Sequence, residues 1–586
     1  MPIHASTMCE AFQKTATIDP DAVAIRTVGD AVTVTWREFA DGVERLAAGL
    51  AGLGVKRGDT VGIMLTNRPE FSIVDAAAMH LGAATFSVYN TSSPEQIDYV
   101  FGNADNKVVI TELGFADTIL ASGAALEHVI VIDGEKEGCL TLAEAEAAAQ
   151  PDFDFDATWR AVEPQDLLTL IYTSGTTGPP KGVQLTHENL ITTANAALAV
   201  THAGFGDRIT SFLPSAHIAD RASAQYFMIG VGVQVTCVAD PRTIGDAFKD
   251  TKPTIWFAVP RVWEKMKAGV EAKLAEEPND KKRRLAEWAI ATGQEKAQAR
   301  LAGTGISRGL AAKAALADKL VLHKLRDALG MSELRWAWSG AAAIAQETLY
   351  FFMGLGIDVV ELWGMSEVTG AGTLNPIGRQ KVGTVGPALP GVELRIAEDG
   401  EILIRSKGVM LGYRKDPERT AETINADGWV LTGDVGSIDE DGYLSIVDRK
   451  KELIISSSGK NMSPTNIENT IKLSTPLAAA LTVIGDARPF NVALVVLDPE
   501  AVATWAQAAG VSADPAQLAK NPDLIAEIQR GVDEGNAKLS RVEQVKRFEI
   551  VPSFWQAGGD ELTPTLKLKR RPIADKYADV ITRLYS

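Results

Sequence analysis

The sequence is poor in cysteine and lacks the long apolar runs of membrane-spanning or secreted chains. Three cysteines, Cys9, Cys139 and Cys237, are scattered over 586 residues without a Cys-x-x-Cys pair. This spacing argues against a disulfide framework or a zinc site and favours a reducing cytoplasm. No stretch reaches about 18 consecutive apolar residues, and the N-terminus lacks the basic-then-apolar pattern of a signal peptide. We therefore expect no spanning helix and a cytoplasmic location.

Positive charge is also scarce, because 58 Lys and Arg residues face 75 Asp and Glu residues and leave a net charge of −17. An acidic surface repels phosphate backbones, so we expect no nucleic-acid partner. Any ligand that carries phosphate must therefore be held by local geometry. The length and the hydrophobic share of 46% exceed what one core usually holds, which predicts two or more domains.

The first third of the chain alternates between helical and extended patterns. Amphipathic runs at residues 36–55 and 69–83 alternate with strand-like runs at 59–65 and 84–90. Further strand-like runs follow at residues 107–112, 128–133 and 167–173. Such βα alternation predicts a parallel sheet with helices on both faces.

Two later sections have different hydrophobic patterns. Residues 262–330 repeat apolar positions at helical spacing among many charges, which predicts a helical insertion. From about residue 380, short strand-like runs between Gly and Asp turns predict a β-rich part. We place a domain boundary near Arg449–Lys451, between a large domain of residues 1–449 and a small domain of residues 450–586. The predicted fold class is α/β, with mixed and parallel sheets flanked by helices in a large multi-subdomain part and a small, mobile α+β domain at the C-terminus.

A loop rich in glycine and hydroxyl groups, "YTSGTTGPPKG" at residues 172–182, follows a strand-like run. Gly175 and Gly178 let backbone N–H groups turn inward, and the Thr and Ser hydroxyls add donors around the charge of Lys181. A kinase-type P-loop needs Gly-Lys-Ser/Thr running straight into a helix. Here Gly182 follows Lys181, and a second extended segment precedes the next helix. The loop is therefore not a kinase-type P-loop, but its donors and charge still predict phosphate binding.

The loop resembles the phosphate-binding loop of the adenylate-forming superfamily, and the resemblance extends over nearly the whole chain to bacterial long-chain fatty-acid–CoA ligases. Further motifs that carry it are "WGMSE" at 363–367, "WSGAAAIAQE" at 338–347, "LTGDVG" at 431–436 and "TPTLKLKR" at 563–570. The resemblance implies a nucleotide site made of Thr173, Ser174, Gly175, Thr176, Thr177, Gly178, Lys181, Gly340, Trp363, Gly364, Ser366, Asp434 and Arg449.

Individual roles follow from the same resemblance. Trp363 would stack on adenine, Asp434 would accept from both ribose hydroxyls, and Arg449 would add a ribose or phosphate contact. Glu367, with Thr173, would hold Mg²⁺. Ser366 departs from the usual Thr of this motif but keeps the hydroxyl group.

The remaining roles concern catalysis and domain movement. His217 in "LPSAHIADR" would flank the acyl carboxylate, and the resemblance makes it catalytic together with Lys181 and Lys567. The usual Ser-Gly-Lys wording around the last lysine is absent, so Lys567 is preferred and Lys569 is the alternative. Lys451 would be the hinge residue of the small domain, and Gly459 would face the CoA channel.

The implied reaction joins a fatty acid to CoA with ATP, and it passes through an acyl-adenylate to give AMP and diphosphate. Mg²⁺, ATP and CoA are then the required small molecules. There are three alternatives: a ligase that loads a carrier protein, a non-catalytic nucleotide-binding homologue, and a kinase or ATPase, which the missing Gly-Lys-Ser/Thr pattern disfavours. Apolar and aromatic residues of the insertion could touch lipid peripherally or pack on the large domain. The sequence leaves chain-length preference and oligomeric state open.

Overall fold

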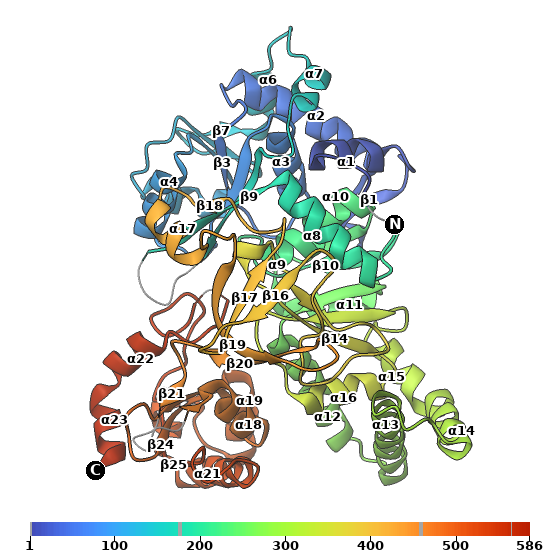
Figure 1. Ribbon diagram of the computed structural model, residues 1–586, viewed down its shortest axis with the longest axis vertical. Helices are drawn as coiled ribbons and strands as arrows, with labels where there is room; N and C mark the ends of the chain where they lie inside the picture. Colours follow the sequence, from blue (N-terminus) through green and yellow to red (C-terminus); the bar gives the residue numbers. More distant parts are fainter. Residues whose placement is uncertain (1–2, 174–178, 456–460, 564) are drawn as a thin grey trace.

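The computed structural model describes residues 3–173, 179–455, 461–563 and 565–586. Figure 1 shows a large body that extends from the top of the view to the lower right, and a C-terminal part at the lower left. No described helix is both long and apolar enough to cross a membrane.

An eight-stranded sheet of order β18-β9-β8-β4-β3-β5-β6-β7 forms the first layer of the large part. Its strands are β3 Thr60–Met64, β4 Ala84–Ser87, β5 Val108–Thr111, β6 His128–Val131, β7 Leu140–Thr141, β8 Leu167–Thr173, β9 Lys181–Thr186 and β18 Gly412–Tyr413. The run from β8 through β7 is parallel, whereas β9 pairs antiparallel with β8, and β18 pairs antiparallel with β9. The predicted parallel sheet is confirmed, with a mixed edge.

Helices cover both faces of this sheet, because its buried strands carry apolar side chains on both sides. Helices α2 (Trp36–Gly52) and α3 (Pro69–His80) share one apolar cluster with alternate residues of β3. Helix α4 (Pro94–Ala104) packs in a second cluster on the other face, with Met64 of the same strand. The arrangement brings the carboxyl ends of β3, β4, β5 and β8 to one edge.

Two further sheets share the largest apolar cluster of the large part. Their orders are β10-β11-β1-β2 and β12-β13-β14-β15. The bounds are β1 Val23–Thr27, β2 Thr33–Thr35, β10 Arg208–Ser211, β11 Gln234–Cys237, β12 Ile255–Ala258, β13 Trp336–Ser339, β14 Asp358–Trp363 and β15 Thr373–Leu374. Strands β12, β13 and β14 are parallel, and β15 turns back antiparallel beside β14.

Helices occupy most of the connection from β12 to β13, as the predicted helical insertion requires. They are α12 Pro260–Ala275, α13 Asp280–Leu301, α14 Arg308–Ala317, a π-helical turn at Asp318–Leu322, and α15 His323–Ala328. Helix α13 packs on α16 (Gln346–Gly354) through Gly293, where a Cβ atom would lie only 2.0 Å from the carbonyl oxygen of Gly354. Glycine at this position therefore permits backbone-to-backbone contact between the two helices.

A twisted antiparallel sheet follows and leads to the proposed domain boundary. Its order is β16-β17-β19-β20, with β16 Glu393–Ile396, β17 Glu401–Arg405, β19 Val430–Ile438 and β20 Leu444–Arg449. Helix α17 (Pro417–Thr423) lies between β18 and β19 in the chain. Apolar residues of this sheet form a small cluster of their own around Trp363.

The C-terminal part is built on a three-stranded sheet of order β23-β24-β25. Its elements are β21 Ile454–Ile455, β22 Asn461–Met462, α18 Pro464–Leu473, β23 Ala478–Ile484, β24 Asn491–Leu497, α19 Pro499–Ala509, α20 Pro515–Leu518, α21 Pro522–Ala537, β25 Val545–Ile550, α22 Arg570–Lys576 and α23 Ala578–Tyr585. Helices α18, α19 and α21 share an apolar cluster with one face of the sheet, and α22 and α23 share one with the other. Both clusters contain only residues after 453, which agrees with the α+β domain expected from the sequence.

Candidate active site

The candidate site lies where β8, β9, β14, β19 and the C-terminal part meet. Strand β8 ends at Thr173, which pairs with Lys181 at the start of β9, so the Gly-rich loop connects two adjacent strand ends. Residues 174–178 of that loop, with the predicted Ser174, Gly175, Thr176, Thr177 and Gly178, lie outside the described residues. Thr173 and Lys181 are half-buried at the rim of the loop.

Glu367 and Tyr413 stand beside Lys181. Glu367 lies in the short helical turn Ser366–Val368 after β14 and is 7% exposed. The Tyr413 hydroxyl donates to its Oε1 atom at 2.7 Å, and the Lys181 amine lies 4.9 Å from the Tyr413 ring centroid. Burial and the charge of Arg419 lower the pKa of Lys181, whereas the charge of Glu367 raises it. Tyr413 is not among the site residues predicted from the sequence.

The residues present fit a magnesium ion. Mg²⁺ is usually held by one or two carboxylates together with substrate phosphate oxygens and water. Glu367 has one carboxylate oxygen engaged by Tyr413, and the Thr173 hydroxyl lies at the end of the strand that leads into the Gly-rich loop. Across the described ranges no cluster of three or more His, Cys, Asp or Glu residues could hold a metal by protein ligands alone. This donor set suits an ion that arrives with phosphate.

Trp363, Asp434 and Arg449 form a second group. The Trp363 indole donates to Asp434 Oδ2 at 2.7 Å, and Arg449 Nε lies 2.8 Å from Asp434 Oδ1. Burial raises the pKa of Asp434, and the charges of Arg449 and Lys567 act against that shift. The Trp363 ring is 8% exposed and packs among the apolar residues of the β16–β20 sheet. The structure thus ties the predicted adenine and ribose residues together, and adenine stacking stays a prediction.

Two glycines and a strained alanine shape the backbone near this group. At Gly364, a Cβ atom would lie 2.3 Å from the carbonyl oxygen of Gly370, so no larger residue fits there. Gly340 follows β13 and abuts the Leu362 side chain, and Ala341 has a φ of +70°. A positive φ is unfavourable for alanine, and such strained backbone conformations are often found where a protein holds a ligand. Ser366 is buried next to Glu367.

His217 is the N-cap residue of the short helix α9 (Ile218–Asp220). Its Nδ1 atom accepts from the Ala219 N–H at 3.1 Å, which leaves the proton of the neutral ring on Nε2. Burial, together with the positive charge of Lys567, lowers the pKa of His217 to about 3. The ring is therefore neutral at physiological pH and can donate one hydrogen bond from Nε2.

Lys567 reaches the same place from the C-terminal part. Two hydrogen bonds hold its backbone to Thr563: Lys567 N–H donates to the Thr563 hydroxyl, and Thr563 N–H donates to the Lys567 carbonyl. Burial and Arg449 lower the pKa of Lys567, whereas Asp434 and Glu367 raise it. The Lys569 amine instead donates to the Gly559 carbonyl at 2.8 Å. The geometry favours Lys567 over Lys569 for a role at the site.

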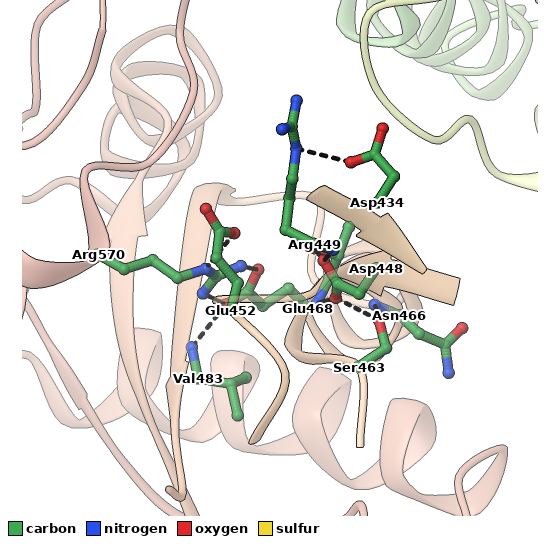
Figure 2. A network of polar contacts seen from close by, with 10 residues as sticks. Asp434, Asp448, Arg449, Glu452, Ser463, Asn466, Glu468, Val483 and Arg570 are labelled. Carbon is green, nitrogen blue, oxygen red and sulfur yellow. Dashed lines mark hydrogen bonds and ion pairs between the residues drawn. The ribbon is translucent and has the colours of Figure 1, made fainter. Parts of the chain in front are cut away.

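The joint between the two parts is anchored on either side of Lys451, and Figure 2 shows the C-terminal side, where Glu452 and Glu468 lie against Arg570. Lys450 pairs with Asp399 at 2.5 Å and with Glu401 at 2.9 Å in the large part. Glu452 and Glu468 both pair with Arg570 of the C-terminal part, at 3.0 and 2.6 Å. The Lys451 side chain between these anchors is exposed. Gly459, the predicted CoA-channel residue, lies outside the described residues.

A set of ion pairs between α12 and the C-terminal part, called here the α12 clasp, holds the two parts together. Arg261 donates to the Ala479 carbonyl at 2.9 Å and pairs with Asp498 at 3.2 Å. One turn later, Glu264 pairs with Lys472 and Lys265 pairs with Glu500, at 2.9 and 2.8 Å. Positions 261, 264 and 265 lie on one helix face, so a single face of α12 meets complementary charges.

Comparisons with known proteins agree with this arrangement. The family described as "AMP-binding enzyme" matches residues 12–414, and the family described as "AMP-binding enzyme C-terminal domain" matches residues 451–586. The chain belongs to the AMP-binding enzyme family. The predicted membership of the adenylate-forming superfamily is therefore confirmed, and the two matches lie on either side of Lys450.

This AMP-binding enzyme is 55% identical over 450 residues to the protein fadD11 of Mycobacterium tuberculosis, which is named as a fatty-acid–CoA ligase. That match covers 77% of this chain and 79% of the relative. The long-chain-fatty-acid–CoA ligase FadD15 of the same organism is 39% identical over 580 residues, covering 97% of this chain and 95% of its own. The anthranilate–CoA ligase AuaEII, solved with anthranoyl-AMP, shares the fold with a TM-score of 0.75 at 19% identity, covering 100% and 99% of the two chains.

Proposed function

We propose that this AMP-binding enzyme is a long-chain fatty-acid–CoA ligase that forms an acyl-adenylate from ATP and then an acyl thioester with CoA. The observation that carries the adenylation step is the approach of Lys567 from the C-terminal part to the large part. Its charge lowers the pKa of His217 and acts against the raised pKa of Asp434, and the charge of Glu367 acts on Lys567 in turn. The assignment of a fatty acid and CoA as substrates rests on relatives such as FadD15, which aligns over nearly the full length of both chains.

The first half-reaction places new negative charge on the α-phosphate as the substrate carboxylate attacks it. The carboxylate is already ionised at neutral pH, so positioning and charge stabilisation do most of the work. Lys181 and Lys567 would neutralise oxygens of the pentacoordinate phosphorus from two sides. Their lowered pKa values follow from burial, which also strengthens the electrostatic contacts they make.

Other residues bind and orient. Glu367 and Thr173 would hold Mg²⁺, which supplies charge neutralisation at the phosphate oxygens when it is bound. Asp434 would accept the ribose hydroxyls, oriented by the Trp363 indole and Arg449. His217, neutral and protonated on Nε2, would donate to an oxygen of the acyl carboxylate and needs no proton transfer.

The second half-reaction requires Lys567 to leave so that the CoA thiol can reach the acyl carbon. Rotation about Lys451 would withdraw Lys567 and bring the segment of Gly459 toward the cleft. The α12 clasp and the contacts of Asp448 with Ser463 and Thr465 connect the two parts in the described arrangement. They would have to break during that rotation, so they stabilise the adenylating arrangement.

Reversing one ion pair of the α12 clasp tests this role. We expect Glu264→Lys to slow acyl-adenylate formation roughly three- to tenfold, because it places two like charges where an ion pair stood. The swapped double variant Glu264→Lys/Lys472→Glu should recover most of the rate. The measurement is diphosphate–ATP exchange with palmitate, and Glu271→Lys, on the same helix but paired within it to Lys267, is the control. Equal rates for wild type and Glu264→Lys would contradict the role.

The proposed function is tested with purified protein, ATP, Mg²⁺ and either palmitate or acetate, each with and without CoA. We expect AMP and palmitoyl-CoA only when palmitate and CoA are both present. Accumulation of palmitoyl-adenylate that CoA does not consume would indicate a carrier-loading ligase. Release of ADP would indicate phosphoryl transfer, and binding of ATP without AMP release under any of these conditions would overturn the proposal.

A further inference from the structure

The helical insertion reverses the charge of the protein locally. Residues 281–326 contain 11 Lys and Arg residues and 3 Asp and Glu residues, whereas the whole chain carries a net charge of −17. This segment comprises most of α13, the whole of α14, the π-helical turn and most of α15. In Figure 1, α14 lies at the lower right edge of the molecule, on the opposite side of the view from the C-terminal part.

Most of this positive charge is uncompensated. Arg283 pairs with Asp280 and Glu287, Arg300 pairs with Asp358, and Arg326 pairs with Asp318. Within the described part of the chain, the other eight basic side chains of the segment form no ion pair, and all eight are exposed. A local excess of exposed positive charge on an acidic protein attracts negatively charged partners to that region.

The same helices expose large apolar side chains between the lysines. Leu316 is 50% exposed and Leu320 is 41% exposed, four residues apart across the junction of α14 and the π-helical turn. Lys313 precedes Leu316 by one turn, and Lys324 follows Leu320 by one turn. Ala314, Ala317 and Leu322 are buried on the inner side of these helices, so Leu316 and Leu320 point outward.

We propose that the α14 face, defined by Lys313, Leu316, Lys319, Leu320 and Lys324, binds the surface of an anionic lipid bilayer. Leucines on a lysine-rich helix enter the boundary between headgroups and acyl chains, and each lysine near the surface is attracted to anionic headgroups. Charge complementarity selects this orientation, because the acidic remainder of the protein is repelled by the same surface. The inference goes beyond the ligase activity and does not depend on it.

A single-stranded nucleic acid fits the face less well. Proteins that bind such strands present aromatic side chains on which the bases stack, in addition to positive charge. The only aromatic residue of the segment, apart from His323, is Trp288, which packs partly buried against the core of the large part. Exposed leucines gain from an apolar environment and would gain nothing from phosphates alone.

The test is co-sedimentation of the full-length protein with phosphatidylcholine vesicles that contain or lack phosphatidylglycerol. We expect binding only to the anionic vesicles, weakened by added salt because the lysine contribution is screened. Leu316→Ser/Leu320→Ser and Lys313→Glu/Lys324→Glu should each weaken binding about tenfold or more. The matched control is Leu113→Ser/Leu120→Ser, which removes two leucines of comparable exposure, 42% and 44%, from the helix α5 (Leu113–Leu120).

Three results would overturn the proposal. The first is no binding to anionic vesicles at low salt. The second is equal loss of binding in the Leu113/Leu120 control, which would place the contact elsewhere. The third is loss in the lysine variant alone, with single-stranded RNA competing fully, which would identify a purely electrostatic surface. Thermal unfolding of each variant at the wild-type temperature would exclude misfolding as the cause of lost binding.

Discussion

Replacing Lys567 with Ala is expected to slow acyl-adenylate formation about a hundred- to a thousandfold, the usual effect of removing one charged group that stabilises a transition state. The second half-reaction should change little, because Lys567 has to leave the cleft before CoA attacks. The measurement compares diphosphate–ATP exchange with thioester formation from added palmitoyl-adenylate. A split between the two half-reactions distinguishes a role in adenylation from general damage to the fold.

Lys569→Ala provides the control, because the Lys569 amine donates to the Gly559 carbonyl within the C-terminal part. We expect its exchange rate to stay within about threefold of wild type. A large loss for Lys569→Ala with little effect of Lys567→Ala would reverse the assignment. Equal losses of both half-reactions in Lys567→Ala would show that the lysine supports the structure of the cleft instead.

Replacing Asp434 with Asn is expected to lower kcat/KM for ATP roughly ten- to a hundredfold, since hydrogen bonds to a charged group are worth about 1.5–3 kcal/mol. The change also leaves Arg449 without its carboxylate partner, which stands 2.8 Å away in the native chain. Ribose contacts are similar before and during reaction, so most of the loss should appear as a raised KM with kcat nearly unchanged.

Asp441→Asn is the matched control for this variant. Asp441 lies in the turn between β19, which carries Asp434, and β20, which ends at Arg449. It pairs with Lys381 on the surface, and its side chain is 72% exposed. Its KM for ATP should equal that of the wild type. If Asp434→Asn left KM for ATP unchanged, the ribose role of Asp434 would be wrong.

The fold was largely predictable because each element carries its own hydrophobic pattern. Strand β3 was expected at residues 59–65 and spans Thr60–Met64, and the helix expected at 69–83 spans Pro69–His80. A run that is apolar on both faces predicts a strand between two helix layers, as found. The antiparallel edge made by β9 and β18 was less visible, because β18 has two residues and comes about 230 residues later.

The site was predictable only where residue types form a local motif. Glu367 and Lys181 were predicted in this way, and the structure places both against Tyr413. Tyr413 was missed because it meets Glu367 from 46 positions away in the chain. The α12 clasp gave no signal at all, since Arg261, Glu264 and Lys265 look like any solvated helix face. Their partners lie more than 200 residues further along, and only the packed structure brings them together.

His217 shows a further limit. Its place in "LPSAHIADR" identifies the residue, but the protonation state follows from burial and from a backbone N–H two residues away. A sequence pattern reveals neither the burial of the ring nor the position of that N–H group. A neutral ring with its proton on Nε2 can act as a hydrogen-bond donor.

The central claim, that the acid is activated as an acyl-adenylate, is tested most directly by isotope transfer from palmitate labelled with ¹⁸O in both carboxylate oxygens. Attack on the α-phosphate places one carboxylate oxygen on phosphorus, and release by CoA leaves it there. We predict one ¹⁸O atom in the phosphate of each AMP released, read by mass spectrometry, and one in the palmitoyl-CoA. AMP without label, or label in inorganic phosphate together with ADP, would contradict the account.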